Sequence, residues 1–167
     1  MHKFPTLMIF VFGMMALISG CGSGSETKGN ENKYVFPSSL PADAPVTEIV
    51  LNSNDQMQYD QEILTVKGGS RVKLTLNHTG QISKAAMGHN VVILKAGVKL
   101  EEYAREALKA SGAGYIPDND QAVAFTKMIG GGETTAISFD APAPGTYEFV
   151  CTYPGHYLLM QGKLIVE

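Results

Sequence analysis

The chain has 167 residues, of which 44% are hydrophobic, and its formal net charge is −3 at pH 7. This length suits one domain with one core. The small net charge gives no basis for binding nucleic acid or for electrostatic attachment to anionic lipid. Eighteen glycines and eight prolines, with few long apolar helical runs, favour a turn-rich, mostly β protein.

The first twenty residues have the pattern of a signal peptide. Residues 7–18 are almost wholly apolar, but too few to span a bilayer comfortably. Residues 18–21, Ile-Ser-Gly-Cys, resemble the lipobox of bacterial lipoproteins, in which the cysteine receives a diacylglycerol and becomes the first residue. The alternative is an ordinary secretory signal, with Cys21 destined for a disulfide. We predict an exported, lipid-anchored protein facing the periplasm or cell exterior. Gly22, where an aspartate is absent, favours the outer membrane.

A flexible tether is predicted for residues 21–43, which begin with the lipidated Cys21 and are rich in Gly, Ser, Asn, Glu and Pro. Such a segment cannot bury enough apolar surface to order itself. The folded domain is predicted for residues 44–167. The chain is therefore divided into a signal peptide, a tether and one domain.

Short alternating strands with turn residues between them follow from about residue 46. They are expected at residues 46–51, 62–66, 72–76, 90–94, 122–128, 135–139, 147–151 and 163–166. Residues 99–110 break the pattern, because their apolar positions have helical spacing. About eight strands at this spacing, with one inserted helix, predict an all-β Greek-key sandwich or barrel.

The loop near the end of the chain carries three candidate metal ligands: Cys151, His156 and Met160. If Cys21 carries lipid, Cys151 is the remaining thiol in an oxidising compartment, where a free thiol would be prone to oxidation. Metal ligation would explain its presence. A thiolate, an imidazole and a thioether on one strand–turn–strand loop are the donor mixture that suits copper in both of its oxidation states.

A second imidazole is needed, and the chain has four histidines. His2 leaves with the signal peptide, so the candidates are His78 and His89. His89 stands at the head of an apolar strand, after Gly88, whose carbonyl could be a long, weak axial contact. Asn90 is placed to join the two ligand loops by side-chain hydrogen bonds that fix the ligand geometry.

These motifs resemble the azurins of the cupredoxin family, the type 1 blue copper proteins. The resemblance covers residues 46–167 and is carried by residues 54–58 (Asn-Asp-Gln-Met-Gln), 76–78, 87–90 (Met-Gly-His-Asn), 126–130 and the loop from Cys151. Four residues between Cys and His and three between His and Met fit azurins rather than plastocyanins. The resemblance implies a copper site made by Gly88, His89, Cys151, His156 and Met160. It also implies that His78 is a buried non-ligand beside the site.

The chain departs from typical azurins in four ways. It lacks the N-terminal disulfide and contains no tryptophan, and Tyr153 replaces the phenylalanine of the ligand loop. The lipid-anchored start is closer to membrane-bound relatives such as auracyanin. None of these departures falls on a ligand.

Electron transfer through one copper ion is the predicted function, with redox proteins such as cytochromes or copper oxidoreductases as partners. We expect no small-molecule substrate and no enzymatic activity, because copper oxidases and nitrite reductases need further histidine-rich centres. A binuclear copper centre would need a second loop cysteine. A copper-handling lipoprotein without redox duty remains an alternative.

The contact site for a redox partner is expected around the edge of the His156 imidazole. Apolar residues of the ligand loop contribute to it, and the resemblance places further ones at the same end of the sandwich. The expected surface, called here the partner patch, consists of Met57, Ile82, Ala86, Met87, Tyr153, Pro154, Leu158 and Leu159. Alternatively, some of these side chains merely close the barrel over the metal.

Overall fold

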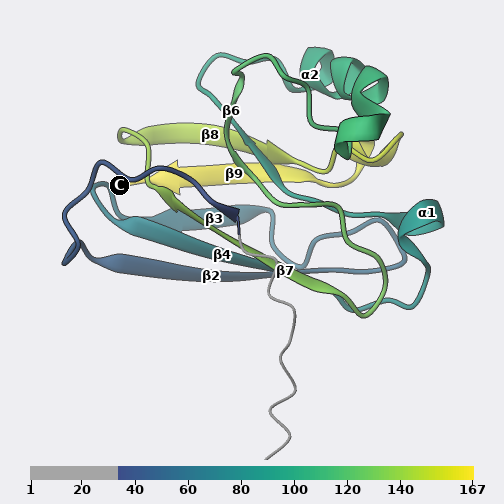
Figure 1. Ribbon diagram of the computed structural model, residues 1–167, viewed down its shortest axis with the longest axis horizontal. Helices are drawn as coiled ribbons and strands as arrows, with labels where there is room; N and C mark the ends of the chain where they lie inside the picture. Colours follow the sequence, from purple (N-terminus) through teal and green to yellow (C-terminus); the bar gives the residue numbers. More distant parts are fainter. Residues whose placement is uncertain (1–33) are drawn as a thin grey trace, which may run out of the picture.

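The computed structural model describes residues 34–167, which form two β-sheets packed face to face (Figure 1). One sheet has four strands in the order β1-β7-β4-β2, and the other has five in the order β3-β9-β8-β5-β6. The first contains β1 (Tyr34–Val35), β2 (Val46–Ser53), β4 (Arg71–His78) and β7 (Thr134–Asp140). The second contains β3 (Ile63–Val66), β5 (Val92–Leu94), β6 (Ala122–Phe125), β8 (Gly145–Val150) and β9 (Gln161–Val166). The all-β sandwich predicted from the sequence is confirmed.

Apolar and polar residues alternate along strands such as β4, so one side of the strand is apolar and the other is polar. In β4, every second residue is buried, including Val72, Leu74 and Leu76. This strand runs parallel to β2 and antiparallel to β7, where Leu74 is paired with Ile137. Alternate side chains of a strand point to opposite faces, so this pattern turns one apolar face toward the other sheet.

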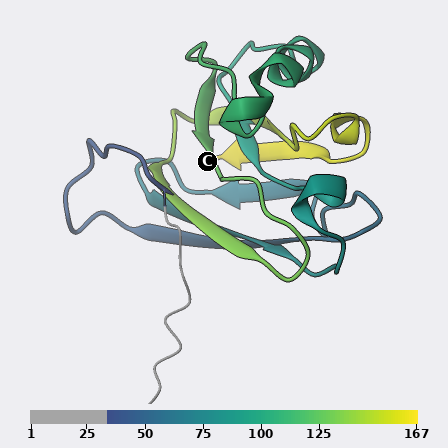
Figure 2. The same cartoon turned by 45° about the vertical axis from the view of Figure 1, so that its right-hand side comes forward.

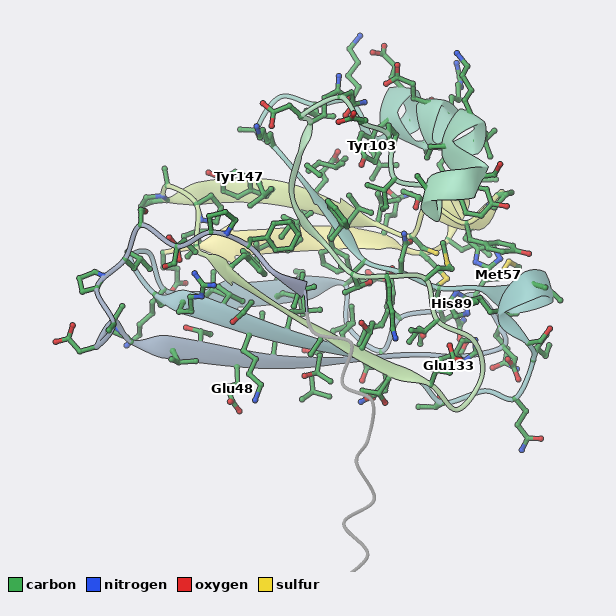
Figure 3. The ribbon with its side chains drawn as sticks, in the orientation of Figure 1. Glu48, Met57, His89, Tyr103, Glu133 and Tyr147 are labelled. Carbon is green, nitrogen blue, oxygen red and sulfur yellow. The ribbon has the colours of Figure 1, made fainter. Side chains whose placement is uncertain are left out.

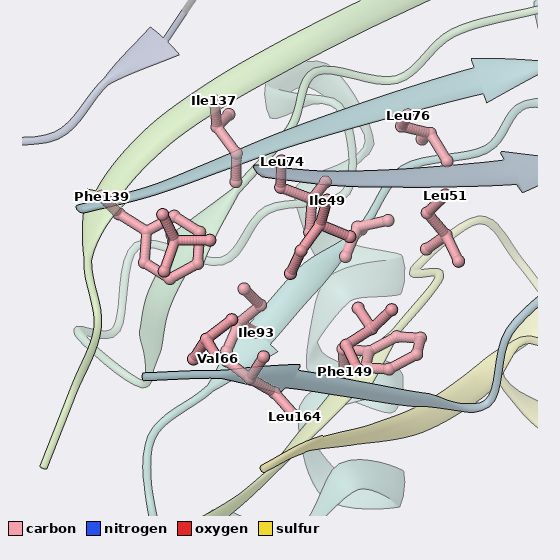
Figure 4. Close-up of a cluster of buried hydrophobic side chains, with 14 of the residues drawn as sticks. Ile49, Leu51, Val66, Leu74, Leu76, Ile93, Ile137, Phe139, Phe149 and Leu164 are labelled. Carbon is pink, nitrogen blue, oxygen red and sulfur yellow. The ribbon is translucent and has the colours of Figure 1, made fainter. Parts of the chain in front are cut away.

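The core lies between the two sheets. Both inner faces contribute to it, as Ile49 and Leu51 from β2 and Ile93 and Phe149 from the five-stranded sheet show (Figure 4). The buried aliphatic and aromatic side chains supply the main stabilisation, at about 25 cal/mol per Å² of apolar surface removed from water. This packing forms the rigid platform from which the end loops project.

A helical segment is inserted between β5 and β6. It comprises α2 (Leu100–Ala107) followed by the 3-10 helix η1 (Leu108–Ala113). The helix expected at residues 99–110 is therefore present, and its last part is a 3-10 helix instead of an α-helix. The buried face of α2, with Leu100 and Tyr103, packs on a second apolar cluster with Leu94 and Val150. Figures 1 and 2 show that this segment covers the outer side of the five-stranded sheet.

Two further short helices lie at the loops of one end. They are α1 (Lys84–Met87), which the sequence pattern did not indicate, and the 3-10 helix η2 (His156–Leu158). The strand expected over residues 122–128 ends at Phe125. The next residue, Thr126, instead uses its hydroxyl to accept a hydrogen bond from the main-chain N–H of Val91 at 2.9 Å.

The segment before β2 is joined to the sandwich, although the sequence places it in the tether. Strand β1 runs parallel to β7, and the Phe36 ring packs edge-on against Phe125 at 5.3 Å. The carboxylate of Asp140 accepts hydrogen bonds from Ser38, Ser39 and Arg71. The two residues of β1 were too short a run to be predicted as a strand. Within residues 34–167, no helix is long and apolar enough to span a membrane.

Candidate metal centre

Three buried side chains converge where the loops of the five-stranded sheet meet. His89 precedes β5, Cys151 directly follows β8, and His156 begins η2. The Cys151 Sγ lies 4.0 Å from Nδ1 of His89 and 3.8 Å from Nδ1 of His156, and the two Nδ1 atoms are 3.2 Å apart. Figure 3 shows His89 at the α1 end of the sandwich.

These separations fit one metal ion held by three ligands. Metal–nitrogen and metal–sulfur bonds are about 2.0–2.3 Å long, so three ligands around one ion lie about 3.6 Å apart. One thiolate with two imidazoles in trigonal arrangement is the donor set typical of blue copper sites. The residues present therefore fit copper, and the three ligand atoms form a possible single metal site.

The His89 ring is oriented by a hydrogen bond on its far side. Its Nε2 donates to the main-chain carbonyl of Asn54 at 2.9 Å, which leaves Nδ1 facing the Cys151 sulfur. A hydrogen bond on one ring nitrogen fixes the tautomer and holds the other nitrogen ready for a metal. Asn54 belongs to the motif that resembles azurins, but its role depends on a contact across the fold and was not predicted.

His78 lies beside the centre with both ring nitrogens engaged. Its Nε2 donates to the Met87 carbonyl at 3.0 Å, and its Nδ1 accepts from the Gly80 N–H at 3.1 Å. Its ring packs against that of His89, with centroids 4.4 Å apart. Neither nitrogen is left to bind a metal.

Burial sets the protonation of the three converging groups. It lowers the pKa of His89 to about 4, with a further contribution from nearby His78, and the same two causes lower the pKa of His156. Both imidazoles are therefore neutral near pH 7, the form that binds metals. Burial raises the pKa of the Cys151 thiol to about 11, although N–H groups of Asn90 and Tyr153 oppose this effect. Metal binding must then release the thiol proton.

Asn90 connects the two chain segments that carry the ligands. Its Nδ2 donates to the Thr152 hydroxyl at 2.8 Å, and its Oδ1 accepts from the Thr152 main-chain N–H at 2.9 Å. Since Asn90 follows His89 and Thr152 follows Cys151, this pair of hydrogen bonds fixes the distance between the two ligands. Thr152 is a supporting residue that the sequence patterns did not reveal.

Gly88 and Met160 are the two expected axial residues; Gly88 directly precedes His89, and Met160 directly precedes β9. The Gly88 carbonyl oxygen is 3.9 Å from the Cys151 sulfur. A Cβ at Gly88 would stand 2.7 Å from the Lys84 carbonyl oxygen and 2.9 Å from the Tyr153 ring, so only glycine fits. Met160 is fully buried, and its carbonyl accepts the Cys151 N–H at 2.9 Å.

The residues of the expected partner patch differ in exposure. Leu158 and Leu159 are 65% and 63% exposed, and Ile82 is 41% exposed. Figure 3 places Met57 at the same end of the sandwich as His89. The Tyr153 hydroxyl donates to the Ala85 carbonyl at 2.6 Å and so joins the ligand loop to α1. Ala86 and Pro154 are exposed, whereas Met57, Met87 and Tyr153 are half-buried.

The fold and the ligand set together define a mononuclear copper-binding β-sandwich. In agreement, residues 46–167 match the model of the copper binding proteins, plastocyanin/azurin family. The chain belongs to this family, and the resemblance to azurin found in the sequence is confirmed.

Individual relatives support the same assignment. The chain is 38% identical over 132 residues to azurin of Achromobacter denitrificans, covering 75% of this chain and 88% of that one. It is 42% identical over 118 residues to outer membrane protein H.8 of Neisseria gonorrhoeae, covering 68% of this chain but only 64% of that protein's length. The crystal structure of reduced auracyanin from Roseiflexus castenholzii superposes with a TM-score of 0.67 at 35% identity, covering 74% and 98% of the two chains.

Proposed function

We propose that the protein is a single-electron carrier that works through one type 1 copper ion at a bacterial membrane surface. The observation that carries this proposal is the burial of the ligands: His89 and Cys151 are fully buried and His156 is 4% exposed. Such a site gives a substrate molecule little access to the metal, whereas an electron can tunnel through the protein. Membership of the copper-binding family supports the same function.

The supporting contacts explain how the chain would assist electron transfer. The bound ion supplies the one-electron couple Cu(II)/Cu(I). The Asn54 carbonyl holds the His89 ring, and the hydrogen bonds between Asn90 and Thr152 hold the Cys151 segment. Ligands fixed in this way move little when the charge of the ion changes, so the rearrangement that slows electron transfer is small. By similarity to the family, Met160 and the Gly88 carbonyl would also hold the ion, more weakly than the other ligands.

A copper-handling role is the competing hypothesis, and electrochemistry separates the two. An electron carrier should give a reversible one-electron voltammogram and should keep its copper in the presence of a chelator. Rapid loss of copper to the chelator, or to a metal-free acceptor protein, together with an irreversible voltammogram would favour copper handling. No enzymatic turnover is expected in either case.

The partner patch is proposed as the contact surface for redox proteins such as cytochromes or copper oxidoreductases. Leu158 and Leu159 expose apolar surface beside the His156 ligand. Transient electron-transfer contacts are small, so one charge at their centre has a large effect.

Leu159→Asp should therefore slow electron exchange with a cytochrome by more than tenfold in stopped-flow measurements, while the absorption spectrum is unchanged. Val46→Asp is the matched control, because Val46 is 61% exposed and begins β2 at the end of the strand far from the centre. Equal rates for Leu159→Asp and wild type would mean that the electron leaves by another face.

Lipid anchoring through Cys21 is proposed from the signal-peptide and lipobox pattern, which lies outside the described residues 34–167. A relative named as an outer membrane protein supports this location. The wild-type protein should carry lipid mass on Cys21 and partition into the detergent phase, whereas Cys21→Ala should lack the lipid mass, be either uncleaved or soluble in the periplasm, and bind copper as before. Wild-type protein in the aqueous phase without lipid mass would contradict the anchor.

A further inference from the structure

Tyr59 is an aromatic residue that approaches the metal centre from the connection between β2 and β3. Its main chain pairs with Ser53 in an isolated bridge, and its ring is half-buried. The ring packs on that of Phe149 in β8, with ring centroids 5.6 Å apart. Phe149 stands two residues before Cys151 in the chain. These contacts leave the ring little freedom, so the position of its hydroxyl is well defined.

The Tyr59 hydroxyl donates a hydrogen bond to the main-chain carbonyl of Asn90. Asn90 is the residue that joins the His89 segment to the Cys151 segment through Thr152. Tyr59 therefore adds a third segment to this arrangement. A shift of the Asn90 main chain would therefore move His89, the ligand directly before it. It would also move the Cys151 segment, which Asn90 holds through Thr152.

We propose that Tyr59 is a positioning residue of the copper centre, whose hydroxyl holds the Asn90 main chain and thereby the placement of His89 and of the Cys151 segment. This inference rests on the proposed function, because it concerns the same centre. Hydrogen bonding around the cysteine sulfur is a recognised determinant of potential in such sites. A displaced Asn90 main chain changes these surroundings, because Asn90 is held to Thr152, the residue after Cys151.

Tyr59→Phe removes only the hydroxyl and tests the proposal in the full copper-loaded protein. Equilibration with a redox couple of known potential should show a change in the ratio of oxidised to reduced protein of about three- to tenfold, where tenfold equals about 59 mV for one electron. The sulfur-to-copper absorption band should also move. In the metal-free protein, the NMR amide signals of Asn90 and Thr152 should shift.

Tyr147→Phe is the matched control. The Tyr147 hydroxyl also donates to a main-chain carbonyl, that of Ala143 at 2.8 Å, but Figure 3 shows this tyrosine toward the other end of the sandwich from His89. Both variants lose one such hydrogen bond and should lose similar stability. Only Tyr59→Phe should change the potential, the absorption band and the two amide signals.

An unchanged potential and unchanged Asn90 and Thr152 signals in Tyr59→Phe would overturn the proposal, even if the variant were less stable. If the proposed function is wrong, the wild-type copper protein will give no reversible one-electron couple. This result distinguishes failure of the proposed function from failure of the proposal for Tyr59. In that case the absorption band and the signals of the metal-free protein still decide whether Tyr59 positions the centre.

Discussion

The ligand loop (residues 151–160) and the inserted segment (residues 95–121) project from the same five-stranded sheet, but different interactions hold them. In the ligand loop, Cys151 donates its N–H to the Met160 carbonyl, and Thr152 and Tyr153 are bonded to residues of the neighbouring segment. The inserted segment instead packs an apolar face on the sheet through Leu100 and Tyr103.

The difference shows which region needs precise geometry. Hydrogen bonds have narrow ranges of distance and angle, so they fix positions closely. Apolar contacts are non-directional and tolerate small displacements. The polar contacts of the inserted segment include exposed ion pairs such as Lys99–Glu102, which contribute little. Its buried Tyr103 hydroxyl has no hydrogen-bond partner among the described residues. Changes in the two regions should therefore have separable effects.

The largest effect is expected for Cys151→Ser. Loss of the thiolate should abolish the intense blue sulfur-to-copper absorption of the copper-loaded protein, while circular dichroism shows the β-sandwich intact. The fold should persist because the side chain is small and its main-chain hydrogen bond to Met160 remains possible. A variant that stays blue would refute the assignment of Cys151 as a ligand.

Leu100→Ala tests the other region. Leu100 is 8% exposed and packs against the second apolar cluster, so its truncation should lower the free energy of unfolding by about 2–4 kcal/mol. Denaturant unfolding measures this loss. The absorption spectrum and the potential should stay at wild-type values, since no metal ligand belongs to this apolar cluster. A shifted spectrum would show that the two regions are coupled.

Asp140→Asn addresses a third region, the N-terminal segment, where we expect a smaller loss of stability. Burial alone would raise the pKa of Asp140, but hydrogen bonds from Ser38, Ser39 and Arg71 outweigh it and lower the pKa to about 2. A carboxylate whose pKa is lowered from 3.8 stabilises the fold above that value, and the effect disappears as the pH falls toward 2.

Denaturant unfolding of wild type and Asp140→Asn at several pH values measures this contribution. The difference in stability between the two proteins should be constant near neutral pH and should vanish between about pH 4 and pH 2. A difference that persists at pH 2 would mean that the Asp140 contacts contribute through packing rather than through charge.

The sequence allowed prediction of most features that depend on local patterns. Alternation indicated the strands of the core, as the fold confirms, and the loop from Cys151 indicated a copper site, which the family and the grouping of His89, Cys151 and His156 support. Contacts between distant segments could not be read in this way. The Asn54 carbonyl behind His89 and the Tyr59 hydroxyl on Asn90 depend on how loops meet in space. The two residues of β1 cannot show an alternation, and the four residues of α1 make barely one helical turn, so neither shows a period.

The attachment of the N-terminal segment also has a mechanical consequence. Force transmitted along the chain from residues before Tyr34 enters the domain at β1, which lies alongside β7 in parallel, so it loads several hydrogen bonds of Tyr34–Ser39 together in shear. From there it reaches Asp140 and Arg71 in the four-stranded sheet. The metal ligands flank strands of the other sheet. The hydrogen bonds of this segment thus pass such a force to the four-stranded sheet, and the Phe36–Phe125 ring contact links the segment to the sheet that carries the metal ligands.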